Sequence, residues 1–250
     1  MIPTPFGWHM VSAGTSGMID REHGSDQVVK RQYDMNNSDS VADLQREYNI
    51  YSVLPQHERL LHLLPGSTPE RLIFPYLSGG TLREHLEAKA SLTTERRLQL
   101  AADAAEALSV LHAHGVVHCD ISLSNYLLDD KVRLYLTDFA GSKLQDHEGS
   151  AAESARYFLP RPIDAPATRP TDVFALGSVG YAIVTGRPPY ADKADEEVEE
   201  LYVKSMFPKV DEILFGDIIQ WCWTGDQDSA KDVHYAIEAL GQVTSSEAVC

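Results

Sequence analysis

The sequence has 250 residues, 43% of them hydrophobic and 23% charged, which is typical of a globular protein with a substantial core. Its formal net charge of −16 at pH 7 argues against a nucleic-acid partner, because binding to a phosphate backbone needs a basic surface. Its 3 cysteines are too few and too scattered for a disulfide framework or a zinc site.

No targeting or membrane-spanning segment is predicted. The amino-terminal residues MIPTPFGWHM lack the basic region and apolar stretch of a signal peptide. The most apolar stretch, residues 173–184, is too short and too rich in glycine to cross a bilayer. Together with the few cysteines, this predicts an intracellular protein, cytoplasmic or nuclear, without a membrane partner.

Short strands separated by glycine are predicted at the start of the chain. Residues 8–13, 17–21 and 26–33 are rich in β-branched and apolar residues, as strands joined by turns are. Lys30 lies in the third of these strands on the same face as Val28, because side chains alternate along a strand. A lysine that faces inward with a valine needs an anionic neighbour.

A helix is predicted for residues 40–54, with an acid inside its apolar face. The apolar face repeats at three- and four-residue steps and consists of Val41, Leu44, Tyr48 and Tyr51. Glu47 lies within it, opposite in sign to Lys30. Taken singly, each of the two charges also fits an exposed surface position.

The rest of the chain is predicted to be mainly helical. A strand at residues 71–77 leads through two glycines into a helix at 81–88. The clearest helix covers residues 94–114, with Gly115 where a carboxyl-terminal cap belongs. Further strands are predicted at 126–128 and 132–137, and further helices at 171–185, 194–204, 211–222 and 229–240.

A cluster of polar residues surrounds the two strands at 126–128 and 132–137. His118, Asp120, Asn125 and Asp138 lie in the run VVHCDISLSNYLLDDKVRLYLTDFAG. Strand ends hold side chains rigidly, and the loops between strands carry chemistry. The carboxylate and amide oxygens of this set suit Mg²⁺ and a substrate hydroxyl better than zinc or a redox metal.

The order His-x-Asp-x-x-x-x-Asn and then Asp-Phe-Ala-Gly resembles the catalytic loop and metal-binding element of the protein kinase family. The resemblance covers nearly the whole chain and implies an α+β, two-lobed protein kinase-like fold. It implies a single domain over residues 1–250. A small β-rich N-lobe with one helix would cover about residues 1–76, a hinge about 75–79, and a larger, mainly helical C-lobe about 80–250.

The resemblance also implies the roles of the catalytic residues. Asp120 would accept the proton of the attacking hydroxyl, and Asn125 and Asp138 would bind Mg²⁺. Lys30 would hold the phosphates of ATP, and Glu47 would hold Lys30. His118 is expected to pack against Phe139 and not to act as a base.

The resemblance implies an ATP site of two glycines, three apolar side chains and two hinge residues. Together with Lys30 and Glu47 they are Gly14, Gly17, Ile19, Val28, Phe74, Pro75 and Leu77. The glycines would let backbone amides approach phosphate oxygens. A plain hairpin turn explains them equally well, because Ser12 stands where the family has its first glycine.

The chain departs from the family pattern at several positions. Cys119 replaces the arginine that receives a loop phosphate in many members, which predicts activity that does not depend on such a phosphate. Ser122 replaces a lysine that contacts the γ-phosphate in serine/threonine kinases. Arg161 replaces a glutamate that normally pairs with an arginine, which predicts an ion pair of swapped signs with Asp226 or Asp228.

Three functions remain open from the sequence. The first is an ATP- and Mg²⁺-dependent protein kinase, with probable preference for serine or threonine. The second is a pseudokinase scaffold, and the third is a small-molecule kinase of the aminoglycoside or choline kinase type. Asp172 and the helices after it resemble protein kinases and oppose the third. The acidic run at 194–201 would attract basic protein substrates, but a solvated helix face explains it as well.

Overall fold

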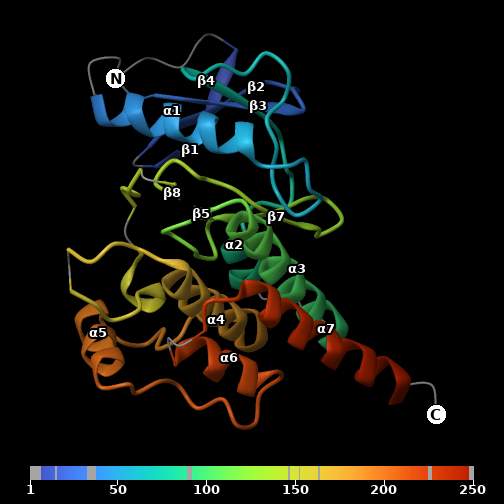
Figure 1. The fold of residues 1–250 in the computed structure, drawn as a ribbon. Coiled ribbons are helices and arrows are strands. Elements are labelled where there is room, and N and C mark those ends of the chain that lie inside the picture. The colour runs from blue at the N-terminus through green and yellow to red at the C-terminus, as the bar shows by residue number, and fades with distance from the viewer. Residues whose placement is uncertain are drawn as a thin grey trace.

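The computed structural model describes residues 7–14, 16–32, 38–88, 92–145, 147–151, 153–162, 164–224 and 227–247, without the side chains of residues 38 and 243–247. The upper part of the molecule is a four-stranded antiparallel sheet with one long helix beside it, and the lower part is mainly helical (Figure 1). This arrangement confirms the predicted α+β, kinase-like fold.

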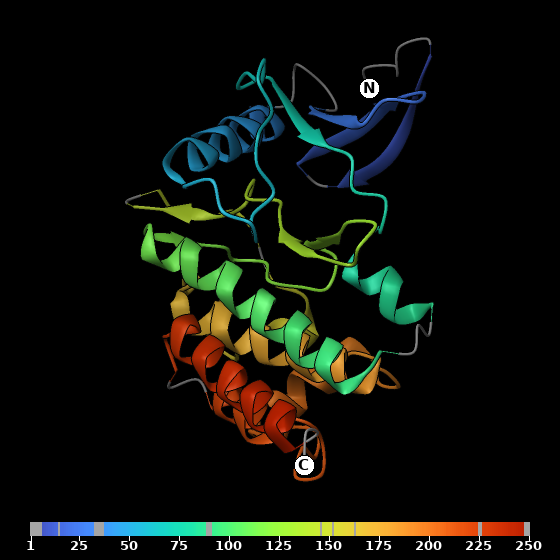
Figure 2. The same cartoon turned by 90° about the vertical axis from the view of Figure 1, so that its right-hand side faces the viewer.

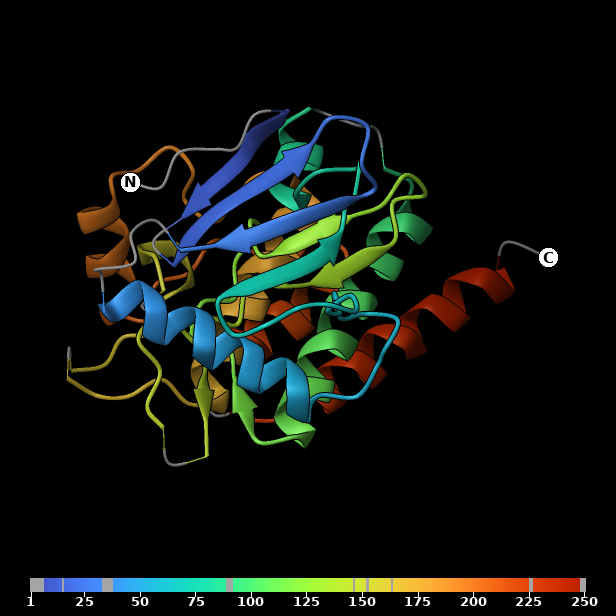
Figure 3. The same ribbon diagram turned by 90° about the horizontal axis from the view of Figure 1, so that it is seen from above.

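The sheet contains the strands that the alternating pattern predicted. In spatial order they are β1 (Trp8–Gly14), β2 (Gly17–Glu22), β3 (Gln27–Arg31) and β4 (Arg71–Pro75). Helix α1 (Ser38–Val53) runs along the β4 side of this sheet (Figure 3). Leu44 of α1 packs with Val28 and Leu72 of the strands, and Tyr48 and Tyr51 join the same cluster, as predicted for the apolar face of this helix. The prediction is wrong for Val41, which is exposed.

Gly17 is required by strand packing in the β1–β2 hairpin. Gly14 and Gly17 lie opposite each other at the turn. A Cβ atom on Gly17 would lie 2.5 Å from the carbonyl oxygen of Arg31 in β3, so that only glycine allows this approach of the two strands. The position of Gly17 is therefore explained without a ligand, and its expected contact with phosphate stays a prediction.

The lower part is built around one long helix. Its helices are α2 (Leu82–Glu87), α3 (Thr94–Ala113), α4 (Arg169–Thr185), α5 (Asp195–Val203), α6 (Gly216–Trp223), α7 (Ala230–Glu247) and the short 3₁₀ helix η1 (Ala155–Tyr157). Helix α3 lies between two small two-stranded sheets above and α7 below (Figure 2). Thr81, which was predicted to lie inside the helix, is the cap that precedes α2. The left-handed Gly115 follows the end of α3, as predicted.

Two small two-stranded sheets lie between the four-stranded sheet and α3 (Figure 2). One pairs β6 (Tyr126–Leu128) with β7 (Leu134–Leu136), as predicted. The other pairs β5 (Val116–Val117) with β8 (Lys143–Leu144), which the sequence analysis did not find, because two-residue strands have no measurable periodicity. Among the described helices, none is both long and apolar enough to cross a membrane.

The predicted helix at 211–222 is wrong at its start. Helix α6 begins only at Gly216, because Phe215 adopts a left-handed conformation with φ +43°. Gly216 packs so tightly on the carbonyl of Val210 that a Cβ atom would overlap it, at 1.9 Å. Residues before this point therefore form turns, which the apolar spacing alone does not reveal.

Candidate active site

Asp172 of α4 holds the backbone of the loop that carries the polar cluster. Its carboxylate is fully buried and accepts hydrogen bonds from the amides of His118, at 2.7 Å, and Cys119, at 3.0 Å. These bonds hold Cys119 in a left-handed conformation, φ +67°, which is costly for a non-glycine residue. Asp172 thus braces this loop and fixes the residue before Asp120.

Asp120 and Asn125 are joined by side-chain hydrogen bonds. The Nδ2 atom of Asn125 donates to the Asp120 carbonyl, at 2.7 Å, and to its Oδ2 atom, at 3.0 Å. Burial raises the pKa of Asp120 to about 6, although the charge of His118 and the bond from Asn125 act in the opposite direction. A carboxylate with this pKa is suited to accept a proton near neutral pH.

The β6–β7 hairpin brings Asn125 next to the residues that precede Asp138. The amide of Thr137 donates to the carbonyl of Asn125 at 3.0 Å. Both side-chain hydrogen bonds of Asn125 use Nδ2, and within the described part of the chain its amide oxygen accepts none. The Asn125 oxygen and the partly exposed Asp138 carboxylate are hard ligands, so this pair fits Mg²⁺ chemically, with other oxygens completing the coordination.

Lys30 lies between two carboxylates that come from distant parts of the chain. Its Nζ atom is 2.6 Å from Glu47 Oε2 and 2.6 Å from Asp138 Oδ1. Lys30 and Glu47 are buried, whereas 43% of the Asp138 side chain is exposed. The predicted inward orientation of both Lys30 and Glu47, and the contact between them, are therefore confirmed.

The pKa values of these three groups shift because burial and their charges on one another act together. Burial lowers the pKa of Lys30, but the two carboxylates outweigh burial and raise it above the ordinary value. Burial raises the pKa of Glu47 to about 7, and Lys30 offsets this only in part. Burial also raises the pKa of Asp138, but the charge and hydrogen bond of Lys30 prevail and lower it. The lowered pKa keeps Asp138 ionised beside Lys30.

A row of aromatic contacts connects the loop to the sheet. The rings of His118 and Phe139 lie 5.6 Å apart in an edge-to-face contact, as predicted. Phe139 continues to Tyr51 of α1, at 4.8 Å, and Tyr51 to Phe74 of β4, at 5.4 Å. Sequence analysis placed Tyr51 only on the apolar face of its helix. Its contacts with both Phe74 and Phe139 depend on the packing of α1 between β4 and the loop after Asp138.

The apolar residues expected around the nucleotide base belong to one cluster. Of the expected residues, Val28 and Phe74 are buried in this cluster, and Ile19 and Leu77 are partly buried and pack against it. Leu127 of β6 also joins this cluster, although the sequence analysis did not select it. Pro75, the last residue of β4, pairs with Gln27 at the edge of the same region.

Cys119 is a buried, neutral thiol. Burial raises its pKa to about 12, so it is neither a reactive nucleophile nor a substitute for an arginine charge. The segment that follows Asp138 is instead bound by Arg46, which precedes Glu47 on α1. Arg46 Nη1 donates to the Ala140 carbonyl and to Ser150 Oγ, each at 2.7 Å, and pairs with Asp43 at 2.7 Å.

We expect Arg46→Ala to lower kcat about tenfold, because the loss of these hydrogen bonds, each worth about 1 kcal/mol, loosens Asp138 relative to α1. Cleavage by thermolysin within residues 139–161 should become faster in the same variant. Steady-state kinetics and timed proteolysis would measure both effects. Arg187→Ala removes an exposed arginine and serves as the control. An Arg46→Ala protein with unchanged kcat and cleavage would contradict this role.

The prediction that Arg161 pairs with Asp228 is wrong. Arg161 Nη2 pairs with Glu153 at 2.7 Å and not with Asp228, while Asp226 lies outside the described residues. The signs are swapped relative to the family pattern, as expected, but the acid comes from the preceding loop. Glu153 is buried, so it needs a nearby cation, and Arg161 is eight residues away in the chain.

Comparisons with known proteins agree with this geometry. Residues 12–237 match the model of the protein kinase domain. The chain is 29% identical over 179 residues to the serine/threonine/tyrosine-protein kinase HT1 of Arabidopsis thaliana, covering 68% of this chain and 46% of that protein. It is 28% identical to the serine/threonine-protein kinase 12 of the same plant, covering 78% and 42%.

A third relative is the dual serine/threonine and tyrosine protein kinase of Macaca mulatta, 30% identical over 205 residues, with 74% of this chain and 22% of that protein covered. The chain thus spans less than half the length of each of these three relatives.

Proposed function

The chain belongs to the protein kinase family, and on this basis we propose that it transfers the γ-phosphoryl group of ATP, with Mg²⁺, to a serine or threonine hydroxyl of a protein. The observation that carries the proposal is the position of Lys30, 2.6 Å from both Glu47 and Asp138. A buried cation shared by an acid of α1 and an acid beside the catalytic loop supports a phosphate-binding role better than a purely structural one.

Each residue of the site has a defined task in this proposal. Lys30 binds phosphate oxygens, and Glu47 keeps its ammonium group in place. Asn125 and Asp138 provide oxygen ligands for Mg²⁺, which neutralises phosphate charge when bound. Asp120 orients the substrate hydroxyl and takes its proton on the carboxylate, while Asn125 holds that carboxylate in position.

The adenine and phosphate positions are part of the same proposal. Ile19, Val28 and Phe74 form the apolar wall against which the base packs, together with Leu127, because all four belong to one cluster at the edge of the sheet. The Pro75 carbonyl and the Leu77 amide provide its polar contacts. Gly14 and Gly17 cover the phosphates with backbone amides.

Two other functions are less well supported. A pseudokinase scaffold would be expected to lack one of the groups that bind phosphate or metal, yet Lys30, Glu47, Asp120 and Asp138 are all present. A small-molecule kinase is disfavoured because the match to the protein kinase domain extends through residue 237. The preference for serine or threonine follows the names of most relatives, and analysis of the phosphorylated amino acid tests it, since two of those names include tyrosine.

We expect phosphorylation of a mixture of proteins by the purified chain with Mg²⁺ and ATP, and a loss of about 10²–10⁴-fold in Asp120→Asn, which has no base. The rate should also depend on pH. The pKa of Asp120 is raised to about 6, so its unprotonated form prevails above pH 6, and kcat/KM should fall as pH drops through 6.

A separate measurement distinguishes Asp120 from Glu47, whose pKa is also raised, to about 7. Protonation of Glu47 loosens Lys30 and weakens ATP binding, whereas protonation of Asp120 leaves binding unchanged. Isothermal titration with a non-hydrolysable ATP analogue between pH 5 and 8 reports the first effect alone. ATP binding without phosphorylation of any protein would favour the scaffold function.

A further inference from the structure

Helix α2 brings an arginine onto the catalytic loop. The amide of Arg83 donates to the carbonyl of Leu123 at 3.2 Å, which fixes the first turn of α2 against this loop. The side chain of Arg83 then reaches Ser124, and its Nε atom donates to Ser124 Oγ at 2.9 Å. Ser124 directly precedes Asn125, whose side chain holds Asp120. A guanidinium group is thus held one residue away from the Asp120–Asn125 pair.

Within the described residues, Arg83 has no acidic ion-pair partner, in contrast to Arg46, Arg156 and Arg161. Arg46 pairs with Asp43 and Arg161 with Glu153, each at 2.7 Å, and Arg156 pairs with Asp195. Arg83 contacts the neutral hydroxyl of Ser124, and within the described residues its two terminal nitrogens donate no hydrogen bond. In a chain with a net charge of −16, acids are plentiful, yet none is paired with this cation.

Arg83 also acts on the segment that faces the catalytic loop. Burial raises the pKa of Tyr157 in η1, while the charges of Arg83 and Arg156 act to lower it. Arg83 therefore lies within electrostatic range of both the catalytic loop and the end of the segment after Asp138. Among the described residues, Arg83 has no hydrogen bond or ion pair with Asp120, whose side chain is bound by Asn125.

We propose that Arg83 binds an anionic side chain of the protein substrate, a carboxylate or a phosphate, a few residues away from the hydroxyl that is phosphorylated. The proposal rests on the proposed kinase function and specifies its substrate. The planar guanidinium keeps Nε on Ser124 and offers the terminal nitrogens, a geometry that suits the two oxygens of a carboxylate or phosphate.

The acidic helix α5 does not oppose this substrate class. Three of its acids already have cationic partners within the chain, namely Asp195 with Arg156, Glu197 with Lys193 and Glu200 with Lys204. Glu196 and Glu199 of the same helix are exposed, so α5 keeps part of its negative charge, but less than the acidic run alone suggests. The local cation beside the catalytic loop is therefore the better guide to specificity than the overall charge.

Peptides with a single acceptor serine test the proposal. In one series aspartate is moved stepwise along each side of the acceptor, and matched series carry phosphoserine, serine or lysine at the same positions. We expect the wild-type protein to prefer aspartate or phosphoserine over lysine about tenfold in kcat/KM at one position, through KM for the peptide. The aspartate and phosphoserine series distinguish a carboxylate from a phosphate as the natural ligand.

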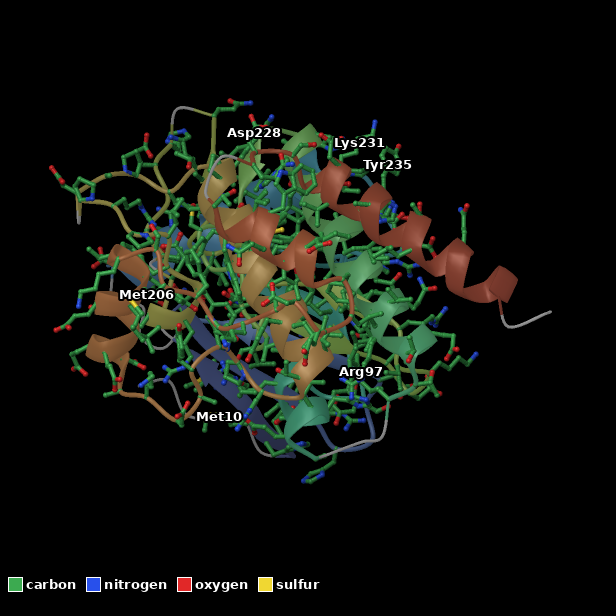
Figure 4. The ribbon with its side chains drawn as sticks, turned by 90° about the horizontal axis from the view of Figure 1, so that it is seen from below. Met10, Arg97, Met206, Asp228, Lys231 and Tyr235 are labelled. Carbon is green, nitrogen blue, oxygen red and sulfur yellow. The ribbon has the colours of Figure 1, made fainter. Side chains whose placement is uncertain are left out.

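Three variants identify the residue responsible. Arg83→Glu should reverse the preference toward lysine, and Arg83→Gln should abolish it without reversing it. KM for ATP should stay unchanged in both. Lys231→Glu makes the same change in charge on α7, on the underside of the molecule (Figure 4), and should keep the wild-type preference.

The possible results separate this inference from the proposed function. Phosphorylation of all peptides with equal efficiency, or a preference that survives Arg83→Glu, overturns the role of Arg83 and leaves the kinase function standing. Failure to phosphorylate any peptide or protein overturns the kinase function, and the inference with it. A variant that loses activity with every peptide is checked by circular dichroism, and Arg83→Gln then decides the outcome.

Discussion

Asp138→Asn should lower the rate of phosphoryl transfer about 10³-fold, the size of effect seen when one preorganised charge is removed from a site that stabilises a transferring group. Asp138 supplies a partly exposed carboxylate to the site and lies 2.6 Å from Lys30. Asparagine fills the same space but has no charge, so the metal site loses its charged ligand and Lys30 loses one of its two counter-charges, leaving Glu47. Single-turnover kinetics with saturating Mg²⁺ and ATP would measure the loss.

Asp130→Asn is the matched control for this variant. Asp130 is exposed and lies in the turn between β6 and β7, so the substitution removes the same charge from the same hairpin. We expect it to retain wild-type kcat. Thermal unfolding of both variants shows whether the fold is intact. Asp138→Asn activity within tenfold of the wild type, with an intact fold, would contradict the metal-binding role of Asp138.

The parts of the site that the sequence could predict are those in which a charge interrupts a regular apolar pattern. Lys30 interrupts a strand and Glu47 interrupts a helix, and an inward charge of either sign requires a partner. The positions of Asp120, Asn125 and Asp138 followed from a motif with fixed spacing between two strands. In all these cases, local structure and burial point in the same direction, which makes the inference reliable.

The remaining contacts could not be predicted, because they join loops that are far apart in the chain and carry no periodicity. Arg46 lies on the polar side of α1, where any charged residue would fit the pattern, and its contact with Ser150 depends on the course of the segment after Asp138. Arg161 is similar, since several acids were equally plausible partners. The contact of Arg83 with the catalytic loop could not be predicted either, because it depends on how α2 packs against Leu123.

Helix α1 connects these two kinds of contact. Glu47 binds Lys30 on the sheet side, and the adjacent Arg46 binds the Ala140 carbonyl just after Asp138. Adjacent residues of a helix point in directions about 100° apart, so one short stretch of α1 reaches both the sheet and the loop. The helix therefore sets the position of Lys30 relative to Asp138 through the Glu47 ion pair on one side and the Arg46 hydrogen bonds on the other.

Lys30→Met should be severely destabilised as well as inactive. The substitution leaves the buried Glu47 carboxylate without a counter-charge, and breaking a buried ion pair in this way costs about 3–5 kcal/mol. The pKa of Glu47 is raised above its ordinary value even beside Lys30, so the folded state binds this proton more tightly than the unfolded state. The stability that this proton contributes is present at low pH and is lost as pH rises through the folded pKa. The free energy of unfolding that Lys30→Met loses relative to the wild type should therefore be smaller at pH 5.5 than at pH 8.

Removing both partners separates stability from catalysis. In the double variant Lys30→Met and Glu47→Met, no buried charge is left unpaired at this contact, so urea unfolding should show most of the lost free energy restored. Phosphoryl transfer should stay about 10²–10³-fold below the wild type, because the cation that holds phosphate is still absent. Lys143→Met removes one partner of the exposed pair with Glu148, at 2.8 Å, and should cost less than about 1 kcal/mol. Recovery of activity together with stability would show that Lys30 serves the fold alone.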